Sequence, residues 1–190
     1  MAEAKKVNPS KVVTGKVRLS YVNLFTPRAD SENGNAEPKY SVQLLIPKTD
    51  TVTIAKIEKA LAAVKADPKS VTTWGGKFLA GYKTPLRDGD TERDTDKSPE
   101  YKGMYFLNAS SSMKPQVVDA DVNPVMDQTE VYSGCYGRVS INLYAFNQKG
   151  GIGIAAGLNN VQKIADGEPL GGRSTAEEDF GAEADDDFLG

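Results

Sequence analysis

Two alternating apolar patterns follow each other in the stretch YGRVSINLYAFNQKGGIGIAAGL, residues 136–158. In residues 136–146 the odd positions are Gly, Val, Ile, Leu and Ala, whereas the even positions are polar or aromatic. In residues 152–158 every second residue is again apolar. A period of two predicts two half-buried strands, and the Gly-containing turn at 148–151 predicts that they form a hairpin.

Similar patterns occur earlier in the chain. Two N-terminal strands are predicted, and their inward faces would be Val13, Gly15, Val17, Leu19 and Tyr21 in the first and Tyr40, Val42, Leu44 and Ile46 in the second. Residues 101–110 predict another strand. Between the second of these strands and the strand at 101–110, apolar residues recur at intervals of three and four over 54–64. This pattern predicts a helix with Asp50 or Thr51 as its N-cap and a stop at Asp67-Pro68.

Strands therefore dominate, with one helix between early and late ones. This order predicts a mainly β protein with one helix, an OB-fold-like five-stranded antiparallel barrel with extra β elements. A β-sandwich with one helical insertion is the main alternative. We expect residues 1–165 to form this domain and residues 166–190 to form a disordered tail.

The expected tail is strongly acidic. It contains nine of the 26 acidic residues and one of the 23 basic residues, so it carries a charge of −8 and the rest of the chain +5. A block of one sign at a terminus is typical of disordered interaction tails, although it can also serve only solubility. An acidic tail on a basic body predicts that the tail competes with a polyanion for the binding surface.

Composition excludes several classes of protein. The chain has no histidine and a single cysteine, Cys135, which excludes Ser/His/Asp and Cys/His catalysis, the usual zinc sites and an internal disulfide. No run of 18 apolar residues is present, and the polar N-terminus lacks a signal peptide. We therefore expect a binding protein of a reducing compartment, with no catalytic residues, metal or cofactor.

Two motifs resemble known sites but lack the required context. The acidic loop has an Asp or Glu at every second position from 88 to 96, yet position six from Asp88 is Arg93 instead of the Gly of a calcium loop. Asp88, Asp90 and Asp94 leave a metal-dependent nuclease as an alternative. The string 151–156 matches G-x-G-x-x-A, but it lies within a strand, so its glycines more simply mark a bend or the close approach of another backbone.

Cations and flat rings on the polar strand faces suggest a nucleic-acid surface. Single-strand binding needs positive charge for phosphates and aromatic rings for bases. An aromatic side chain could instead be covered by the helix, a loop or a second copy of the chain. The candidate DNA-binding residues are Lys16, Arg18, Trp74, Lys114, Tyr136, Arg138, Tyr144 and Phe146.

Several segments in order resemble the phage-encoded single-stranded DNA-binding proteins, which have an OB-fold body. The segments are 40–48 (YSVQLLIPK), 84–90 (TPLRDGD), 114–119 (KPQVVD), 131–135 (VYSGC) and 157–163 (GLNNVQK) followed by Asp166-Gly-Glu168. The resemblance implies sequence-tolerant binding of single-stranded DNA during phage replication or recombination, in the cytoplasm of the bacterial host.

The tail is also similar to acidic tails that recruit replication proteins. On this resemblance, Asp185, Asp186, Asp187 and Phe188 would contact a polymerase, helicase or recombinase, although Phe188 is followed here by Leu189-Gly190. A second copy of the chain, forming a homodimer, is a further candidate partner. The alternative function is a structural or oligomeric phage β protein that does not bind nucleic acid.

Overall fold

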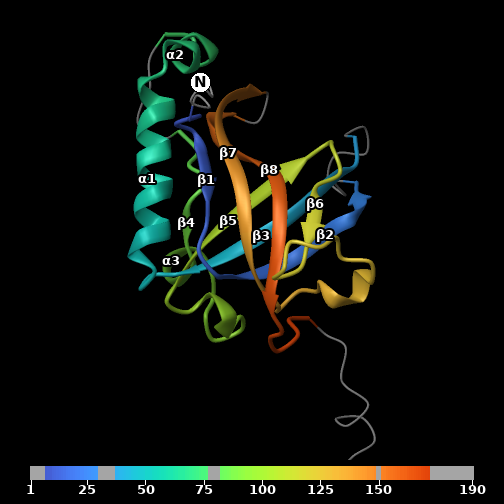
Figure 1. Cartoon of the computed structure of the whole chain (residues 1–190). Coiled ribbons are helices and arrows are strands. Elements are labelled where there is room, and N and C mark those ends of the chain that lie inside the picture. Colours follow the sequence, from blue (N-terminus) through green and yellow to red (C-terminus); the bar gives the residue numbers. More distant parts are fainter. Residues whose placement is uncertain (1–6, 30–36, 77–81, 149–150, 172–190) are drawn as a thin grey trace, which may run out of the picture.

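The computed structural model describes residues 7–29, 37–76, 82–148 and 151–171 (Figure 1). In this part of the chain the strands are β1 (Lys11–Val13), β2 (Val17–Arg28), β3 (Lys39–Pro47), β4 (Arg87–Asp88), β5 (Met104–Ser111), β6 (Gln116–Val118), β7 (Tyr136–Gln148) and β8 (Gly151–Ala165). The helices are α1 (Thr51–Ala66), α2 (Pro68–Thr73) and α3 (Gly89–Glu92), with 3-10 turns at Pro99–Tyr101 and Gln128–Glu130. None of these helices is long and apolar enough to cross a membrane.

Five strands close into a barrel. They neighbour each other in the order β2-β3-β5-β8-β7, and β7 pairs back with β2. The β5–β8 pair is parallel and the other four are antiparallel. If the five barrel strands are renumbered 1 to 5 in chain order, their order around the barrel is 1-2-3-5-4-1. This is the Greek-key closure of an OB fold. The predicted fold class is confirmed, and closure excludes the β-sandwich.

The β7–β8 hairpin is the longest pairing in the barrel, as its sequence pattern predicts. Its register runs from Tyr136↔Ala165 to Gln148↔Gly151. Val139, Ile141 and Leu143 of β7 are buried in the core, so the even positions of β7 face outward. The apolar face that identifies this hairpin in the sequence is thus the inner wall of the barrel.

The helix α1 lies along one side of the barrel (Figure 1) and buries Ile57, Ala60 and Val64. Asp50 is its N-cap, since Oδ1 accepts a 3.1 Å hydrogen bond from the Thr53 N–H. The helix ends before Pro68 as predicted. The expectation of a single helix is wrong, however, because Pro68 fits the first turn of a new helix, α2.

The predicted first strand is divided into β1 and β2, and its alternation changes phase twice. Thr14 is fully buried and its hydroxyl accepts a 3.0 Å hydrogen bond from the Val139 N–H, whereas Val13 is 39% exposed. Further on, β2 has one extra residue relative to β3 between Ser20 and Asn23. This bulge turns Tyr21 outward, with φ of +45° and 60% exposure, which corrects its predicted inward position.

Candidate nucleic-acid interface

A groove of about 620 Å³ lies on the outer surface of the barrel, over β5 and β8. Phe146, at the end of β7, forms part of its wall. Asn108 and Ser110 come from β5, and Ala155 from β8. The remaining side is the segment 82–87, which contributes Tyr82, Lys83, Thr84, Pro85 and Arg87. Glu92 of α3 also lines the groove, and its carboxylate pairs with Arg87. The groove therefore combines aromatic rings, polar side chains and cations with one carboxylate that is paired.

Gly153 allows this segment to lie against β8. Lys83 and β8 exchange two backbone hydrogen bonds, Lys83 N to Ile152 O at 3.1 Å and Ile154 N to Lys83 O at 2.9 Å. A Cβ on Gly153 would collide with the carbonyl oxygen of Lys83. The interpretation of this glycine as a place of close backbone approach is confirmed.

Arg87 is a cation at the groove that the sequence analysis did not select. Its guanidinium lies 4.9 Å from the centre of the Phe106 ring and pairs with Glu92 at 2.9 Å. The 84–90 segment carried part of the family resemblance, but nothing in its local pattern shows that Arg87 borders a groove. That position depends on the pairing of β4 with β5.

The five barrel strands contain no acidic residue. Every Asp and Glu of the described residues lies in a helix, in β4 or in a connection, whereas the barrel strands carry five basic residues. These are Arg18, Arg28, Lys39, Arg138 and Lys163. Lys163 pairs with Asp166 at 2.6 Å and Arg18 is partly buried, whereas Arg28, Lys39 and Arg138 are exposed. Barrel strands without carboxylates do not repel the phosphates of a polyanion, so their outer surface favours binding of one.

Lys114 lies at the same end of the barrel as two other cations. Arg28 and Lys39 are paired across β2 and β3, next to the connection between these strands. Ser111, three residues before Lys114, pairs with Tyr40. All three cations are exposed.

Lys16, Arg18 and Tyr136 gather at the start of β7. The Lys16 amino group lies 5.5 Å and the Arg18 guanidinium 5.9 Å from the centre of the Tyr136 ring. Arg18 also donates to the carbonyl oxygens of Gly134 at 3.2 Å and Glu168 at 2.6 Å. The structure thus gives Arg18 a contact with the C-terminal segment in addition to its predicted one with phosphate.

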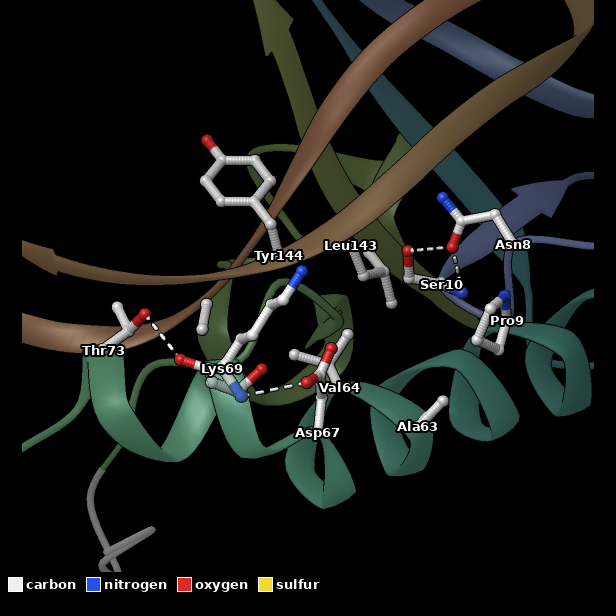
Figure 2. A pocket seen from close by; sticks show the side chains of 12 residues that line it. Asn8, Pro9, Ser10, Ala63, Val64, Asp67, Lys69, Thr73, Leu143 and Tyr144 are labelled. Atoms are coloured by element: carbon white, nitrogen blue, oxygen red, sulfur yellow. Dashed lines mark hydrogen bonds between the residues drawn. The ribbon is translucent and has the colours of Figure 1, made fainter. Parts of the chain in front are cut away.

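Tyr144 borders a second hollow, of about 300 Å³, between the N-terminal segment, the α1–α2 junction and β7 (Figure 2). Its ring is 44% exposed and points away from the helices, while Lys69 extends from α2 toward β7 (Figure 2). Asn8 and Asp67 line the hollow and accept local hydrogen bonds from the N–H groups of Ser10 and Lys69. Tyr144 is therefore accessible to a base, but outside the groove of Phe146.

Trp74 does not belong to the surface. It is 5% exposed, and its indole N–H donates a 3.0 Å hydrogen bond to the carbonyl oxygen of Gly153. Its ring packs at 5.2 Å from the Tyr82 ring. The burial of Trp74 in the core contradicts the prediction that its ring stacks on DNA. The exposed Tyr21 is a ring that the sequence analysis missed, since only the bulge brings it outward.

The acidic loop serves the fold. Lys48 bridges Asp88 and Asp90, each at 2.8 Å, and Asp90 also accepts the Gly103 N–H at 3.0 Å. The hydrogen bonds that Lys48 donates lower the pKa of the Asp88 and Asp90 carboxyls and raise the pKa of Lys48 itself. Two carboxylates bridged by an ammonium group are poorly placed to hold a metal ion, which weakens the nuclease alternative.

Apart from the buried Trp74, the predicted DNA-binding residues occupy four places on the outer surface. Phe146 lies in the groove, Tyr144 at the helical hollow and Lys114 near the β2–β3 connection. Lys16, Arg18, Tyr136 and Arg138 lie toward the start of β7. The predicted partner-binding residues Asp185, Asp186, Asp187 and Phe188 lie outside the described residues.

A closed barrel of OB strand order, with a ring-lined groove and no acid in its strands, defines the chain as an OB-type binding protein. The chain belongs to the family of the Enterobacter phage Enc34 ssDNA-binding protein, whose sequence model matches residues 10–189. It is also 31% identical over 176 residues to protein p50 of Acyrthosiphon pisum secondary endosymbiont phage 1, covering 87% of this chain and 89% of p50.

Solved structures agree with this assignment. The single-stranded DNA-binding protein from bacteriophage Enc34 in complex with ssDNA superimposes with a TM-score of 0.73 at 30% identity, covering 88% of this chain and 97% of that one. The single-stranded DNA-binding protein gp2.5 of bacteriophage T7 has a TM-score of 0.58 at 15% identity, covering 87% and 97%. The second likeness shows the shared fold alone.

Proposed function

We propose that this protein binds single-stranded DNA without regard to sequence and protects strands exposed during phage DNA replication and recombination. The observation that carries the proposal is the groove beside Phe146 in a barrel whose five strands contain no acidic residue. Membership of the Enc34 family, with one relative solved in complex with ssDNA, supports it.

Binding would combine stacking and charge. Phe146, Tyr144 and Tyr21 offer accessible rings, and stacking of a base on a ring contributes about 1–3 kcal/mol. Lys16, Arg138 and Lys114 offer cations to phosphates. Neither contact depends on the identity of the base, which accounts for sequence tolerance. The mechanism needs no covalent chemistry.

The acidic tail would compete with DNA. Residues 166–171 cross the outer surface of the barrel, where Leu170 packs against the cluster of Leu45, Tyr101 and Phe106. The tail therefore begins on the surface that carries the groove. In this proposal, Asp185 to Phe188 would be displaced by DNA and become available to a polymerase, helicase or recombinase in the host cytoplasm.

The test is a titration of fluorescein-labelled oligo-dT, followed by anisotropy, at several salt concentrations. A dye on the DNA is required because the buried Trp74 is a poor reporter. We expect tight single-strand binding, weak duplex binding, and a log–log salt slope near −0.7 for each phosphate contacted. Absence of binding at low salt, with and without residues 172–190, would refute the function and favour a structural phage protein.

A further inference from the structure

A small apolar hollow lies on the outer face of the hairpin, remote in sequence from the Phe146 groove. It has a volume of about 180 Å³ and lies between β1 and β6, over β7 and β8. Val13, Val118 and Val122 form its apolar walls, and Arg138 and Gln162 supply polar groups. This volume is several times the ~30 Å³ that a water molecule occupies in the liquid, so it can hold an organic ring.

Val122 is held in a conformation that valine rarely adopts. Its φ is +67°, and its side chain is 68% exposed. Asp119 maintains the turn, because its Oδ1 accepts the N–H groups of Asp121 and Asn123 at 2.9 Å and its carbonyl oxygen accepts that of Val122 at 3.1 Å. A positive φ strains the backbone of a β-branched residue, and burial of the exposed Val122 side chain does not offset this cost. Backbone strain of this kind is found often at binding sites.

Cations and carboxylates lie on different sides of the hollow. The strands β1, β7 and β8 contain no acidic residue, whereas Asp119 and Asp121 lie in the turn that carries Val122. Arg138 is oriented by a 3.1 Å hydrogen bond from Nε to the Thr14 carbonyl oxygen, and Lys11 lies on the same face of β1 as Val13. Neither Arg138 nor Lys11 forms an ion pair with another described residue. On the β1 and β7 side of the hollow, these two cations can therefore contact an anionic group such as a phosphate.

The hollow and the groove both border the outer face of β7. Phe146, Tyr144, Asn142, Ser140 and Arg138 alternate on its outer face. Phe146 and Arg138 are eight residues apart, about 26 Å at the rise of an extended strand.

We propose that bound single-stranded DNA extends from the groove along the outer face of β7, and that one base inserts between Val13 and Val122 with a flanking phosphate on Arg138. This base subsite rests on the proposed function and adds a second anchoring point to it. It predicts that affinity grows with oligonucleotide length until the strand reaches both the groove and the hollow.

The test compares oligo-dT of about 5 and about 15 nucleotides, within the range that one OB fold covers. Val122→Gly removes the apolar wall and suits a positive φ, so its melting temperature should equal or exceed that of the wild type. Val122→Asn, which also tolerates this φ, checks that loop flexibility is not the cause. Met126→Ala is the control, because Met126 is 89% exposed on the same connection but outside the hollow.

Both Val122 variants should bind the long oligonucleotide at least about fivefold more weakly than the wild type does, because about fivefold is the smallest effect expected from the loss of one base contact. Both variants should bind the short oligonucleotide as the wild type does. Normal binding of the long oligonucleotide by both variants would overturn the subsite and leave the proposed function intact. A change in self-association without a change in DNA binding would also overturn it, in favour of a contact between copies. Failure of the wild type to bind either oligonucleotide would instead refute the proposed function.

Discussion

The Arg18 guanidinium holds the backbone of Glu168 through a 2.6 Å hydrogen bond to its carbonyl oxygen. Close to this contact, the Leu170 N–H donates to the Ser133 carbonyl oxygen at 2.8 Å, and Gly134 leaves no space for a Cβ beside Glu168. The segment 166–171 is thereby fixed on the barrel before most of the acidic residues begin.

Two truncations should consequently behave differently. Removal of residues 172–190 deletes seven acidic residues and one basic residue, so we expect severalfold tighter binding of oligo-dT at low salt and a smaller difference at high salt. The melting temperature should not change. Removal of residues 166–190 should lower it, because Leu45, Tyr101 and Phe106 lose the packing of Leu170. Unchanged affinity in the shorter truncation would contradict competition by the tail.

Phe146→Leu should weaken binding of single-stranded DNA by about 1–3 kcal/mol, since leucine retains apolar packing but offers no ring for stacking. Phe146→Trp should bind normally or more tightly. The measurement is anisotropy with labelled oligo-dT, after thermal unfolding has shown that both variants are folded. Val52→Ala is the control because Val52 is 65% exposed at the start of α1. Equal affinity of the wild type and the three variants would show that bases do not stack on Phe146.

Arg138→Gln should reduce the steepness of the log–log salt dependence by about 0.7, which corresponds to one phosphate contact on a single strand. Arg138→Lys retains the charge and should retain most of the slope. Lys59→Gln removes a charge from the exposed face of α1 and should leave binding unchanged. An unaltered slope in Arg138→Gln would show that this face of β7 does not contact phosphates.

The Lys48 bridge should support the fold in a pH-dependent way. Lys48 lowers the folded-state pKa of Asp88 and Asp90, so this contribution is present above their unfolded pKa values, near 4, and is lost as pH falls through the lower folded values. Thermal unfolding between pH 2 and 7 should therefore show the largest deficit of Lys48→Gln near neutrality. A deficit that grows on acidification would contradict the assignment. Lys97→Gln, whose partner Asp94 is 3.7 Å away, is the control.

The strands and the barrel were predictable because local pattern and tertiary environment agree. The alternation in β7 and β8 reflects one face in the core, and a Gly-containing turn joins them, so the hairpin follows from nearest neighbours. Asp50 and Pro68 mark the ends of α1 for the same reason. The absence of histidine and the scarcity of cysteine excluded whole classes of chemistry without a structure.

The surface was less predictable, since exposure is a property of the folded molecule. The sequence places Trp74 among candidate stacking residues, but α2 directs its indole into the core and toward the Gly153 carbonyl. Tyr21 changes faces because of one extra residue in β2, which no period-two pattern records. Arg87 borders the groove because β4 pairs with β5.

Sequence patterns were sufficient to predict the fold class, the concentration of acidic charge in the C-terminus and the polar face of β7. These features depend on residue type and spacing within one segment. Three features appear only in the folded molecule: the closure of the barrel through the β2–β7 and parallel β5–β8 pairs, the groove between segments far apart in the chain, and the strained position of Val122. Such features arise from long-range backbone hydrogen bonds, which join almost any residue types and so leave little trace in the sequence.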